Sequence, residues 1–539
     1  MKILLTALSA KNIHKTLAPW CLKAYCDEYN PSCEVIVAEY TINENIFDIA
    51  DNIYLQKPDI IGLSCYIWNV EQILKLTSLI KQLLPHCIIV LGGPECSFEQ
   101  DLSDFPCADY IIAGEGEQKF SKLIELIENG VSPEKGVIHG GNSVPFSELP
   151  TPFTAEYFAS FAKGKMKSAE NQLIYFEGTR GCPFSCAYCL SSVNSGVECF
   201  SFSRIREELE KLIGYGAKCI KFVDRTFNAN KKLAKEILSY ILNLETDCTF
   251  HFEAAADLFD EGMFTIIEKM PPCRIQFELG IQTVNEKTLE EINRKTDIDL
   301  VFRNIEKLVS FGNCHIHVDL IAGLPFDTLE SFKLAINRSI SARPHMLQLG
   351  FLKLLKGSKL RKSSEEYGYV YSAFPPYQCL KNNYISADKI IFLKEIEAVA
   401  DKFYNSGMYQ NSVNFAISEI FESAYDFFSE LAVFCRGKNT KVTLKNSYTI
   451  LLNFLLKHTT KEQAEHYVKL DCISFDRKAM LPDAIANLRD KKAENEYRNN
   501  KENPQAVRIE SFELDGKKRL IDYTVKNPVT GAFKIEIIN

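Results

Sequence analysis

The chain has 539 residues, 46% hydrophobic and 24% charged, which is typical of a globular protein with roughly three or four domains. Its 62 Lys and Arg residues against 70 Asp and Glu residues give a net charge of −8, which argues against a primary role in binding nucleic acid. No apolar run approaches the roughly 18–20 residues that cross a membrane, so we expect no membrane partner.

The N-terminus, MKILLTALSAK, resembles a short signal peptide, but it also fits the first buried strand of an α/β domain, which we prefer. The eighteen cysteines are spread along the chain, and many lie in apolar strand-like runs, where they act as small core residues. This usage fits a reducing compartment, so we expect a cytoplasmic protein.

The first 125 residues alternate short apolar strands with helical stretches, a pattern that predicts a doubly wound parallel sheet of the Rossmann or flavodoxin-like type. The predicted strands cover 2–7, 34–38, 59–64, 87–92 and 109–113. Ligands of such sheets bind at the carboxyl ends of the strands. Candidate binding residues at three of these ends are Ser64, Tyr66, Gly92, Gly93, Pro94, Gly114, Glu115 and Gly116.

A second series of six β/α repeats follows, which predicts a partial TIM-type (β/α)6 barrel. Its strands are expected at 173–177, 218–224, 249–255, 274–279, 315–321 and 346–351. Long helical patterns such as 387–406 and 414–433 come next, then a polar stretch (489–504) expected to be a solvated connector, and two strand-like runs around a turn at 527–531. The expected organisation is an α/β domain (1–130), a linker (131–170), the barrel (171–355) and a mainly helical C-terminal domain (356–539).

The segment GTRGCPFSCAYC places Cys182, Cys186 and Cys189 directly after the first barrel strand. Three thiolates in one Gly- and Pro-containing loop can converge on a soft metal centre. Structural zinc normally takes four ligands, whereas the next cysteine here, Cys199, is ten residues further on. A cubane cluster held by three cysteines leaves one iron open for a small-molecule chelate.

The C-x3-C-x2-C spacing, with the aromatic Tyr188 before the last cysteine, resembles the radical S-adenosylmethionine (SAM) superfamily. The resemblance implies a [4Fe–4S] cluster whose open iron binds SAM. It also implies reductive cleavage of SAM to methionine and a 5′-deoxyadenosyl radical, which abstracts hydrogen from unactivated carbon.

Several polar residues on the barrel strands are further SAM-site candidates. Asp224 and Arg225 end the second strand, where Asp224 resembles an acceptor for the SAM ammonium group; the alternative, a helix N-cap, suits Asn228 or Asn230 better. Glu253, Glu278 and Gln282 are polar groups among apolar neighbours and resemble SAM-contacting or cleft positions. His315 and His317 share one strand face, where core histidines are a commoner explanation than metal ligands.

With the barrel's family in view, the first domain resembles the cobalamin-binding domain fused to many radical SAM barrels. Its strand-end motifs would hold the nucleotide tail and corrin edge, and His14 and Thr16 are expected on the same rim. The D-x-H-x-x-G motif of cobalt-ligating domains is absent, since Asn12 precedes His14 by two residues. We therefore expect cobalamin without a protein imidazole ligand; the alternative is a degenerate domain. Tyr66, Trp68 and Trp20 either pack on the corrin or belong to the core.

The whole layout, including the string VDRTFN (223–228), resembles cobalamin-domain radical SAM proteins with an uncharacterised C-terminal domain. The resemblance implies a methyltransferase that uses methylcobalamin and a 5′-deoxyadenosyl radical on unactivated carbon. The alternatives are a non-methylating radical rearrangement or cyclisation, and a non-catalytic cobalamin- or SAM-binding sensor. A low-potential flavodoxin or ferredoxin is the expected electron donor, and the substrate is not indicated.

Overall fold

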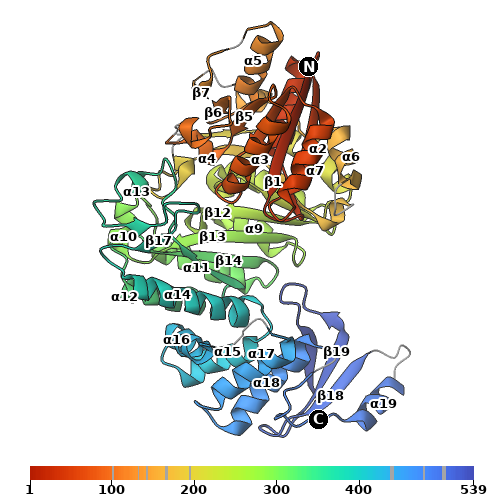
Figure 1. The fold of residues 1–539 in the computed structure, drawn as a ribbon. Coiled ribbons are helices and arrows are strands. Elements are labelled where there is room, and N and C mark those ends of the chain that lie inside the picture. Colours follow the sequence, from red (N-terminus) through yellow and green to blue (C-terminus); the bar gives the residue numbers. More distant parts are fainter. Residues whose placement is uncertain are drawn as a thin grey trace. The chain divides into compact units, whose positions relative to one another are not determined.

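The structure, a computed structural model, describes residues 1–99, 102–131, 133–140, 144–163, 168–192, 196–437, 442–477, 480–499 and 506–538. The chain divides into two compact units. Their helices and strands are labelled in Figure 1. The first unit contains Met1–Lys269, Glu290–Lys295 and Leu352–Leu380, and the second contains Met270–Leu289, Thr296–Phe351 and Lys381–Asn539. No helix in the described ranges is both long enough and apolar enough to span a bilayer.

The N-terminal part of the first unit is the predicted doubly wound sheet, with six parallel strands in the order β3-β1-β4-β5-β6-β7. The strands are β1 (Lys2–Ser9), β3 (Glu34–Thr41), β4 (Ile60–Ser64), β5 (Ile88–Gly92), β6 (Tyr110–Ile112) and β7 (Gly136–Ile138). The strand order reverses between β1 and β4, which is where such sheets bind ligands.

Alternating residues of the strands sort onto the two faces of this sheet. Leu4 and Leu8 pack under α2 (Ile46–Gln56) and α3 (Val70–Leu83). Ile3 and Leu5 pack under α1 (Ala18–Tyr29) and α5 (Glu117–Glu128). Both faces are therefore apolar and covered, which explains the near-continuous apolar strands in the sequence.

The expected linker holds more structure than predicted. It contributes the edge strand β7 and the helix α6 (Ala155–Lys163), and Tyr157 of that helix is fully buried. A strand of only three residues is too short to show a hydrophobic period, which is why the sequence did not indicate it. Residues 132, 141–143 and 164–167 of this stretch, including Gly141, lie outside the described residues.

Three strands of the barrel series belong to the first unit and three to the second. In the first unit, β8 (Leu173–Phe176), β11 (Cys219–Phe222) and β12 (Thr249–Ala254) pair in parallel in this order. In the second unit, β13 (Ile275–Gln282), β14 (His315–Ala322) and β15 (Met346–Phe351) do the same. The helices between them are α7 (Phe202–Gly214), α8 (Lys231–Leu242), α9 (Glu261–Glu268), α10 (Glu286–Glu291), α11 (Ile298–Ser310) and α12 (Leu329–Ser341). All six predicted strands are present, so the β/α repeats are confirmed.

One pairing in the first unit was not predicted. The loop after β1 contains the short strand β2 (His14–Lys15), which pairs in parallel with β8, His14 opposite Leu173 and Lys15 opposite Ile174. A segment of the N-terminal domain thus joins the edge of the barrel sheet.

The C-terminal part of the second unit is mainly helical, as predicted, and ends in an antiparallel sheet. Its longer helices are α14 (Ala387–Ala400), α16 (Ala424–Cys435), α17 (Leu444–Leu455) and α18 (Lys461–Phe475). The expected helix 414–433 is divided, because Ser423 caps a new helix by accepting a hydrogen bond from the Asp426 amide. The final strands β19 (Lys518–Lys526) and β20 (Phe533–Ile538) flank the predicted turn, and β18 (Val507–Ser511) adds a third strand.

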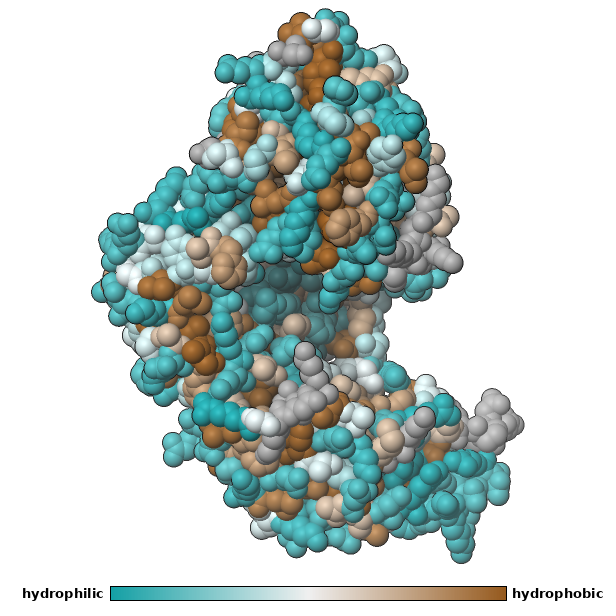
Figure 2. Space-filling model, viewed as in Figure 1, coloured by the Kyte–Doolittle hydropathy of each residue, from teal (hydrophilic) through white to brown (hydrophobic). Residues whose placement is uncertain are grey.

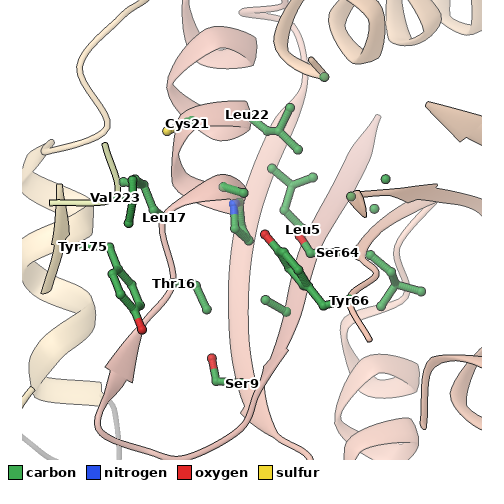
Figure 3. Close-up of a pocket in the computed structure, with 18 of the residues that line it drawn as sticks. Leu5, Ser9, Thr16, Leu17, Cys21, Leu22, Ser64, Tyr66, Tyr175 and Val223 are labelled. Atoms are coloured by element: carbon green, nitrogen blue, oxygen red, sulfur yellow. The ribbon is translucent and has the colours of Figure 1, made fainter. Parts of the chain in front are cut away.

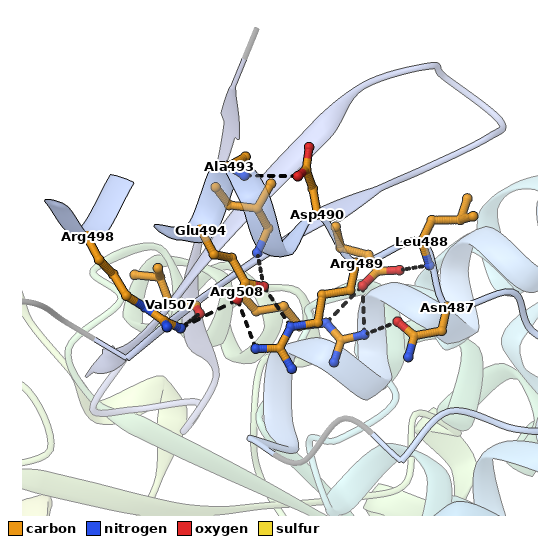
Figure 4. Close-up of polar contacts among 11 residues, drawn as sticks. Asn487, Leu488, Arg489, Asp490, Ala493, Glu494, Arg498, Val507 and Arg508 are labelled. Carbon is orange, nitrogen blue, oxygen red and sulfur yellow. Dashed lines mark hydrogen bonds and ion pairs between the residues drawn. The ribbon is translucent and has the colours of Figure 1, made fainter. Parts of the chain in front are cut away.

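The polar stretch 489–504 is not simply a solvated connector. Residues Lys491–Asn499 form the helix α19, and Glu494 within it is only 2% exposed. Arg489 makes two bonds to this carboxylate at 2.7 and 2.9 Å, and the Ile509 amide donates to it at 3.1 Å (Figure 4). The outer surface around α19 is largely hydrophilic (Figure 2). The charge of the sequence therefore suggested that the whole stretch is exposed to solvent. Residues 500–504 of the stretch lie outside the described residues.

We expect Glu494→Ala to lower the free energy of unfolding by about 2 kcal/mol, because it removes the acceptor of the buried Ile509 amide and of the partly exposed Arg489 and Arg498. Glu496→Ala is the matched control in the same helix, since Glu496 is exposed and its ion pair with Lys492 is 4.0 Å long. The control should change stability by less than about 0.5 kcal/mol. Calorimetric unfolding of the full chain measures both, and equal effects would contradict a structural role for Glu494.

Candidate cofactor sites

A cavity of about 700 Å³ lies in the first unit at the carboxyl ends of the N-terminal strands. The predicted residues that line it are His14, Thr16, Ser64, Tyr66, Gly92, Gly93, Gly114 and Gly116. Pro94 and Glu115 are not among its lining residues: Pro94 begins the short helix α4 (Pro94–Ser97), and Glu115 lies 3.9 Å from Arg180. Eight of the ten residues predicted to bind cobalamin therefore line the cavity, together with many apolar residues that were not predicted.

Two glycines at the end of β5 have different roles. Gly93 has φ +105°, and a Cβ there would lie 2.6 Å from the Cys65 carbonyl oxygen, so the chain itself requires glycine. Gly92 is not in the left-handed region, and a Cβ there would meet only the Ile112 oxygen, at 3.9 Å. The missing side chain of Gly92 therefore keeps space open in the cavity rather than relieving strain.

The opposite wall of the cavity comes from the barrel strands, which sequence reasoning missed. It contains Tyr175, Lys221, Val223, Arg225 and Glu253. Figure 3 shows Tyr175 and Val223 facing the cavity across from Ser64 and Tyr66. Lys221 lies on β11, and Val223 and Arg225 follow that strand at the same two-residue spacing, which was the visible signal. Arg225 and Glu253, predicted near SAM, thus line the same cavity as the strand-end glycines.

Hydrogen bonds hold the polar groups of this cavity in place. The Tyr175 hydroxyl and His14 Nδ1 are 2.9 Å apart, and Lys221 Nζ is 3.3 Å from Glu253 Oε1. Burial, with the charges of Lys11 and Lys221, lowers the pKa of His14, so its imidazole is neutral at pH 7. The Thr16 amide donates to Glu39 Oε1 at 3.0 Å, which fixes the loop after β2.

The aromatic candidates separate into two groups. Tyr66 and Trp68 stack with ring centroids 4.3 Å apart and both line the cavity. Trp20 is 5% exposed and packs edge-on against Tyr157, so it is a core residue.

The three candidate cluster cysteines lie at the end of β9 (Thr179–Cys182) and in the loop that joins it to its antiparallel partner β10 (Gly196–Cys199), all in the first unit. Cys182 ends β9, and the Cys189 amide donates to the Cys186 oxygen at 3.1 Å, which turns the loop back on itself. Cys199 pairs opposite Thr179, three residues from Cys182, or about 10 Å along the strand. It is therefore badly placed as a fourth ligand.

A buried guanidinium group lies beside this loop. Arg294 Nη1 is 3.9 Å from the Cys186 sulfur and 3.3 Å from the Tyr188 hydroxyl. Burial alone would lower the pKa of Arg294, but Tyr188 and Cys186 raise it above its ordinary value, so the cation persists. Three thiols on one loop, a nearby fixed positive charge and no fourth cysteine fit an iron–sulfur cluster with an open iron better than closed tetrahedral zinc.

The structure corrects the expected role of Asp224. Its side chain is fully buried, and its oxygens accept hydrogen bonds from the Gly178 amide at 2.8 Å and the Thr179 hydroxyl at 2.9 Å. Burial raises the pKa of Asp224 to about 7. The carboxyl group therefore holds the segment leading into the cysteine loop and is not exposed to accept from a SAM ammonium group. The N-cap of α8 is Asn230, as the sequence indicated.

Polar residues on β13 and β14 gather in the second unit. Ligand atoms of Glu278, His317 and Asp319 lie within 4.8 Å of one another, and His317 Nε2 is 3.0 Å from Asp319 Oδ1. Gln282 has φ +70°, and its buried Oε1 makes no hydrogen bond among the described residues. An unsatisfied buried oxygen fits a ligand-facing group, so SAM contact by Glu278 and Gln282 stays a prediction. His315 instead packs against His345, with ring centroids 5.1 Å apart.

Three protein families match successive parts of the chain: the B12 binding domain over residues 3–124, the radical SAM superfamily over 176–338, and a protein family of unknown function (DUF4080) over 365–537. The chain is thus a radical SAM protein with an N-terminal B12-binding domain, of the group that carries DUF4080. The cofactors that these domains imply are a [4Fe–4S] cluster, SAM and cobalamin.

Two known relatives are each 26% identical to parts of the chain. One is 2-(S-pantetheinyl)-carbapenam-3-carboxylate methyltransferase of Streptantibioticus cattleyicolor, over 58% of this chain and 49% of the relative. The other is the cobalamin-dependent radical SAM methyltransferase TokK of Streptomyces tokunonensis, over 63% and 54%. The chain therefore spans about half the length of these relatives.

A solved structure shares the fold: the cobalamin-dependent SAM radical enzyme OxsB with aqua-cobalamin bound, at a TM-score of 0.61. The alignment covers 87% of this chain and 78% of OxsB at 13% identity, so it supports the fold alone.

We expect Cys186→Ala to abolish the iron–sulfur cluster, because one of three thiolate ligands is removed. Reconstituted wild-type protein should hold about four irons per chain, measured by iron analysis and absorbance. Cys199→Ala is the matched control and should retain them. Loss of iron in both variants would contradict the three-cysteine site.

We expect Gly92→Val to weaken cobalamin binding by at least about tenfold while the fold is retained, because its side chain would occupy the cavity. Titration with hydroxocobalamin followed by absorbance, with circular dichroism for the fold, measures this. Gly136→Val is the control, since it adds the same side chain to β7, where a Cβ meets nothing within 4 Å. Unchanged affinity in Gly92→Val would place cobalamin elsewhere.

Proposed function

We propose that the chain is a SAM- and cobalamin-dependent radical enzyme that methylates an unactivated carbon atom. One observation carries the proposal: a single cavity has the B12-domain strand ends as one wall and barrel strands β8, β11 and β12 as the other. A ligand held by the glycine-rich ends therefore faces side chains of β8, β11 and β12. The two relatives described above are methyltransferases by name, which supports methyl transfer as the outcome.

Each proposed cofactor has its own set of candidate residues. Cys182, Cys186 and Cys189 would hold the cluster, Glu278 and Gln282 would contact SAM, and the glycine-rich strand ends would hold cobalamin. When bound, the reduced cluster and SAM supply a 5′-deoxyadenosyl radical, and cobalamin supplies a transferable methyl group.

The residues of the chain bind, orient and shield these groups. The apolar lining, including Leu5, Val90 and Phe120, excludes water from the deep part of the cavity. At its polar side, the Tyr175–His14 and Lys221–Glu253 pairs present hydrogen-bonding groups whose orientation is fixed in advance, so little is lost in ordering them when a ligand binds. Arg294 stabilises negative charge at the cysteine loop.

A low-potential flavodoxin or ferredoxin is the proposed electron donor, because cleavage of SAM requires an electron delivered to the cluster. The cytoplasm is the proposed location. All eighteen cysteines, each among the described residues, are thiols rather than disulfides, which suits a reducing compartment.

The test is product analysis after anaerobic reconstitution with iron, sulfide, cobalamin and SAM, followed by a strong reductant. We expect both 5′-deoxyadenosine and S-adenosylhomocysteine by mass spectrometry, and loss of 5′-deoxyadenosine in the Cys182/Cys186/Cys189→Ala variant. 5′-Deoxyadenosine alone would favour the non-methylating radical reaction. Neither product, from protein that holds about four irons, would overturn the enzyme proposal in favour of a sensor.

A further inference from the structure

A segment that follows the barrel strands, Leu352–Leu380, is part of the first unit and is here called the strap. Its ends join, because the Cys379 amide donates to the Leu352 oxygen at 2.8 Å and Lys353 bridges to Gln378. The radical SAM match ends at residue 338 and the DUF4080 match begins at 365, so no family match covers its first half.

The strap is attached to the B12 domain immediately after Gly92 and Gly93. The Tyr377 hydroxyl donates to Glu95 Oε1, and both residues are 3% exposed. Burial raises the pKa of Glu95, although the hydrogen bond from Tyr377 and the positive charge of Lys356 act to lower it. Replacing Tyr377 therefore leaves a buried carboxyl group without its hydrogen-bond donor.

A second attachment lies next to this bond. The Gly357 amide donates to Glu99 Oε1 at 3.0 Å, and Arg361 Nε is 2.8 Å from Glu99 Oε2. The same arginine lies over the Tyr377 ring, 4.7 Å from its centroid, so the two attachments support each other. A Cβ on Gly357 would be 2.5 Å from the Phe98 ring, which shows how closely the strap backbone approaches this domain.

The other side of the strap is attached to the cysteine loop. The Leu360 amide donates to the oxygen of Ala187, the residue between Cys186 and Tyr188, at 3.0 Å. The Tyr367 hydroxyl donates to Glu291, which belongs to the same short segment as Arg294. Arg361 and Leu360 are adjacent, so only one peptide unit separates the contact with the B12 domain from the contact with the cysteine loop.

We propose that the strap is a positioning element, with Tyr377 as a positioning residue, that fixes the position of the segment Gly92–Glu99 relative to the cysteine loop. It thereby controls how much SAM is used for methyl transfer and how much for radical formation. The second half of this proposal rests on the proposed function. Its physical basis is that group-transfer and radical steps depend steeply on the distance between the reacting groups, so a displacement of about 1 Å is costly.

Hydrogen exchange on protein without cofactors tests the first half. Tyr377→Phe should accelerate exchange roughly tenfold in two separate segments, Gly92–Phe98 and Pro183–Leu190, because the loss of one buried hydrogen bond loosens both attachments. Tyr404→Phe is the matched control, since Tyr404 is equally buried at 3% and its hydroxyl donates to Pro344 in the second unit. It should leave both segments unchanged. Acceleration confined to Gly92–Phe98 would overturn the coupling.

Glu99→Asn gives a second variant should Tyr377→Phe fail to fold. Glu99 is partly exposed with φ +50°, a conformation that asparagine tolerates, and the shorter side chain removes the ion pair with Arg361. It should accelerate exchange in the same two segments by a smaller factor, and no acceleration in Pro183–Leu190 would overturn the proposal.

The reconstituted enzyme tests the second half. In Tyr377→Phe, the relaxation of the reduced cluster's EPR signal by cob(II)alamin should change, and the ratio of S-adenosylhomocysteine to 5′-deoxyadenosine should shift at least about threefold. An altered exchange pattern with an unaltered ratio would overturn the control of SAM use. Absence of both products in the wild type would instead mark failure of the proposed function, and the exchange result would still stand.

Discussion

Main-chain pairing of β2 with β8 brings the B12-domain strand ends and the barrel strands to one cavity. The loop after β1 crosses to the second sheet, and Lys15 at its end is 3% exposed. Its ammonium group pairs with Glu39 and lies 5.1–5.3 Å from the ring centroids of Trp20, Tyr157 and Phe161. Burial lowers the pKa of Lys15, while Glu39 raises it, so the ion is tolerated because its partners are fixed. His14 and Thr16 line the cavity because this anchor lies between them.

Two arginine side chains with fixed partners lie next to the cysteine loop. Arg180, two residues before Cys182, is held by Glu177 at 2.8 Å and by Glu117 of the B12 domain at 2.9 Å. Arg294 approaches the same loop from elsewhere in the chain. Both guanidinium groups are largely buried and both have partners, which is the condition under which a buried charge positions its neighbours without a large stability cost. The cysteine loop is therefore oriented by its surroundings more than by its own three thiols.

The predictable part of the site depended on local patterns. The spacing of Cys182, Cys186 and Cys189, and the glycines at the ends of β5 and β6, are visible within a dozen residues, because thiol clusters and close backbone approach require particular residue types. Tyr175, Lys221 and Arg294 were missed, since their importance arises only from which strands become neighbours. Asp224 was misjudged for the same reason: a carboxylate at a strand end looks ligand-facing until the adjacent segment, Gly178 and Thr179, is seen to bind it. The burial of Glu494 was also not predicted, because nothing in its charge-rich helix indicates which one of the charged side chains is buried.

The domain boundary at residue 355 illustrates why sequence similarity and physical connection differ. The last expected barrel strand ends at residue 351, just before this boundary, and the two family matches end and begin on either side of it. The hydrogen bonds of residues 356–380 nevertheless run back to Glu95, Glu99 and Ala187, in the first 190 residues. A chain cut at the family boundary would leave Glu95 buried without Tyr377 and expose the Ala187 carbonyl. The structural boundary is therefore after Leu380, and the segment before it belongs with the cofactor sites even though its sequence resembles neither domain that forms them.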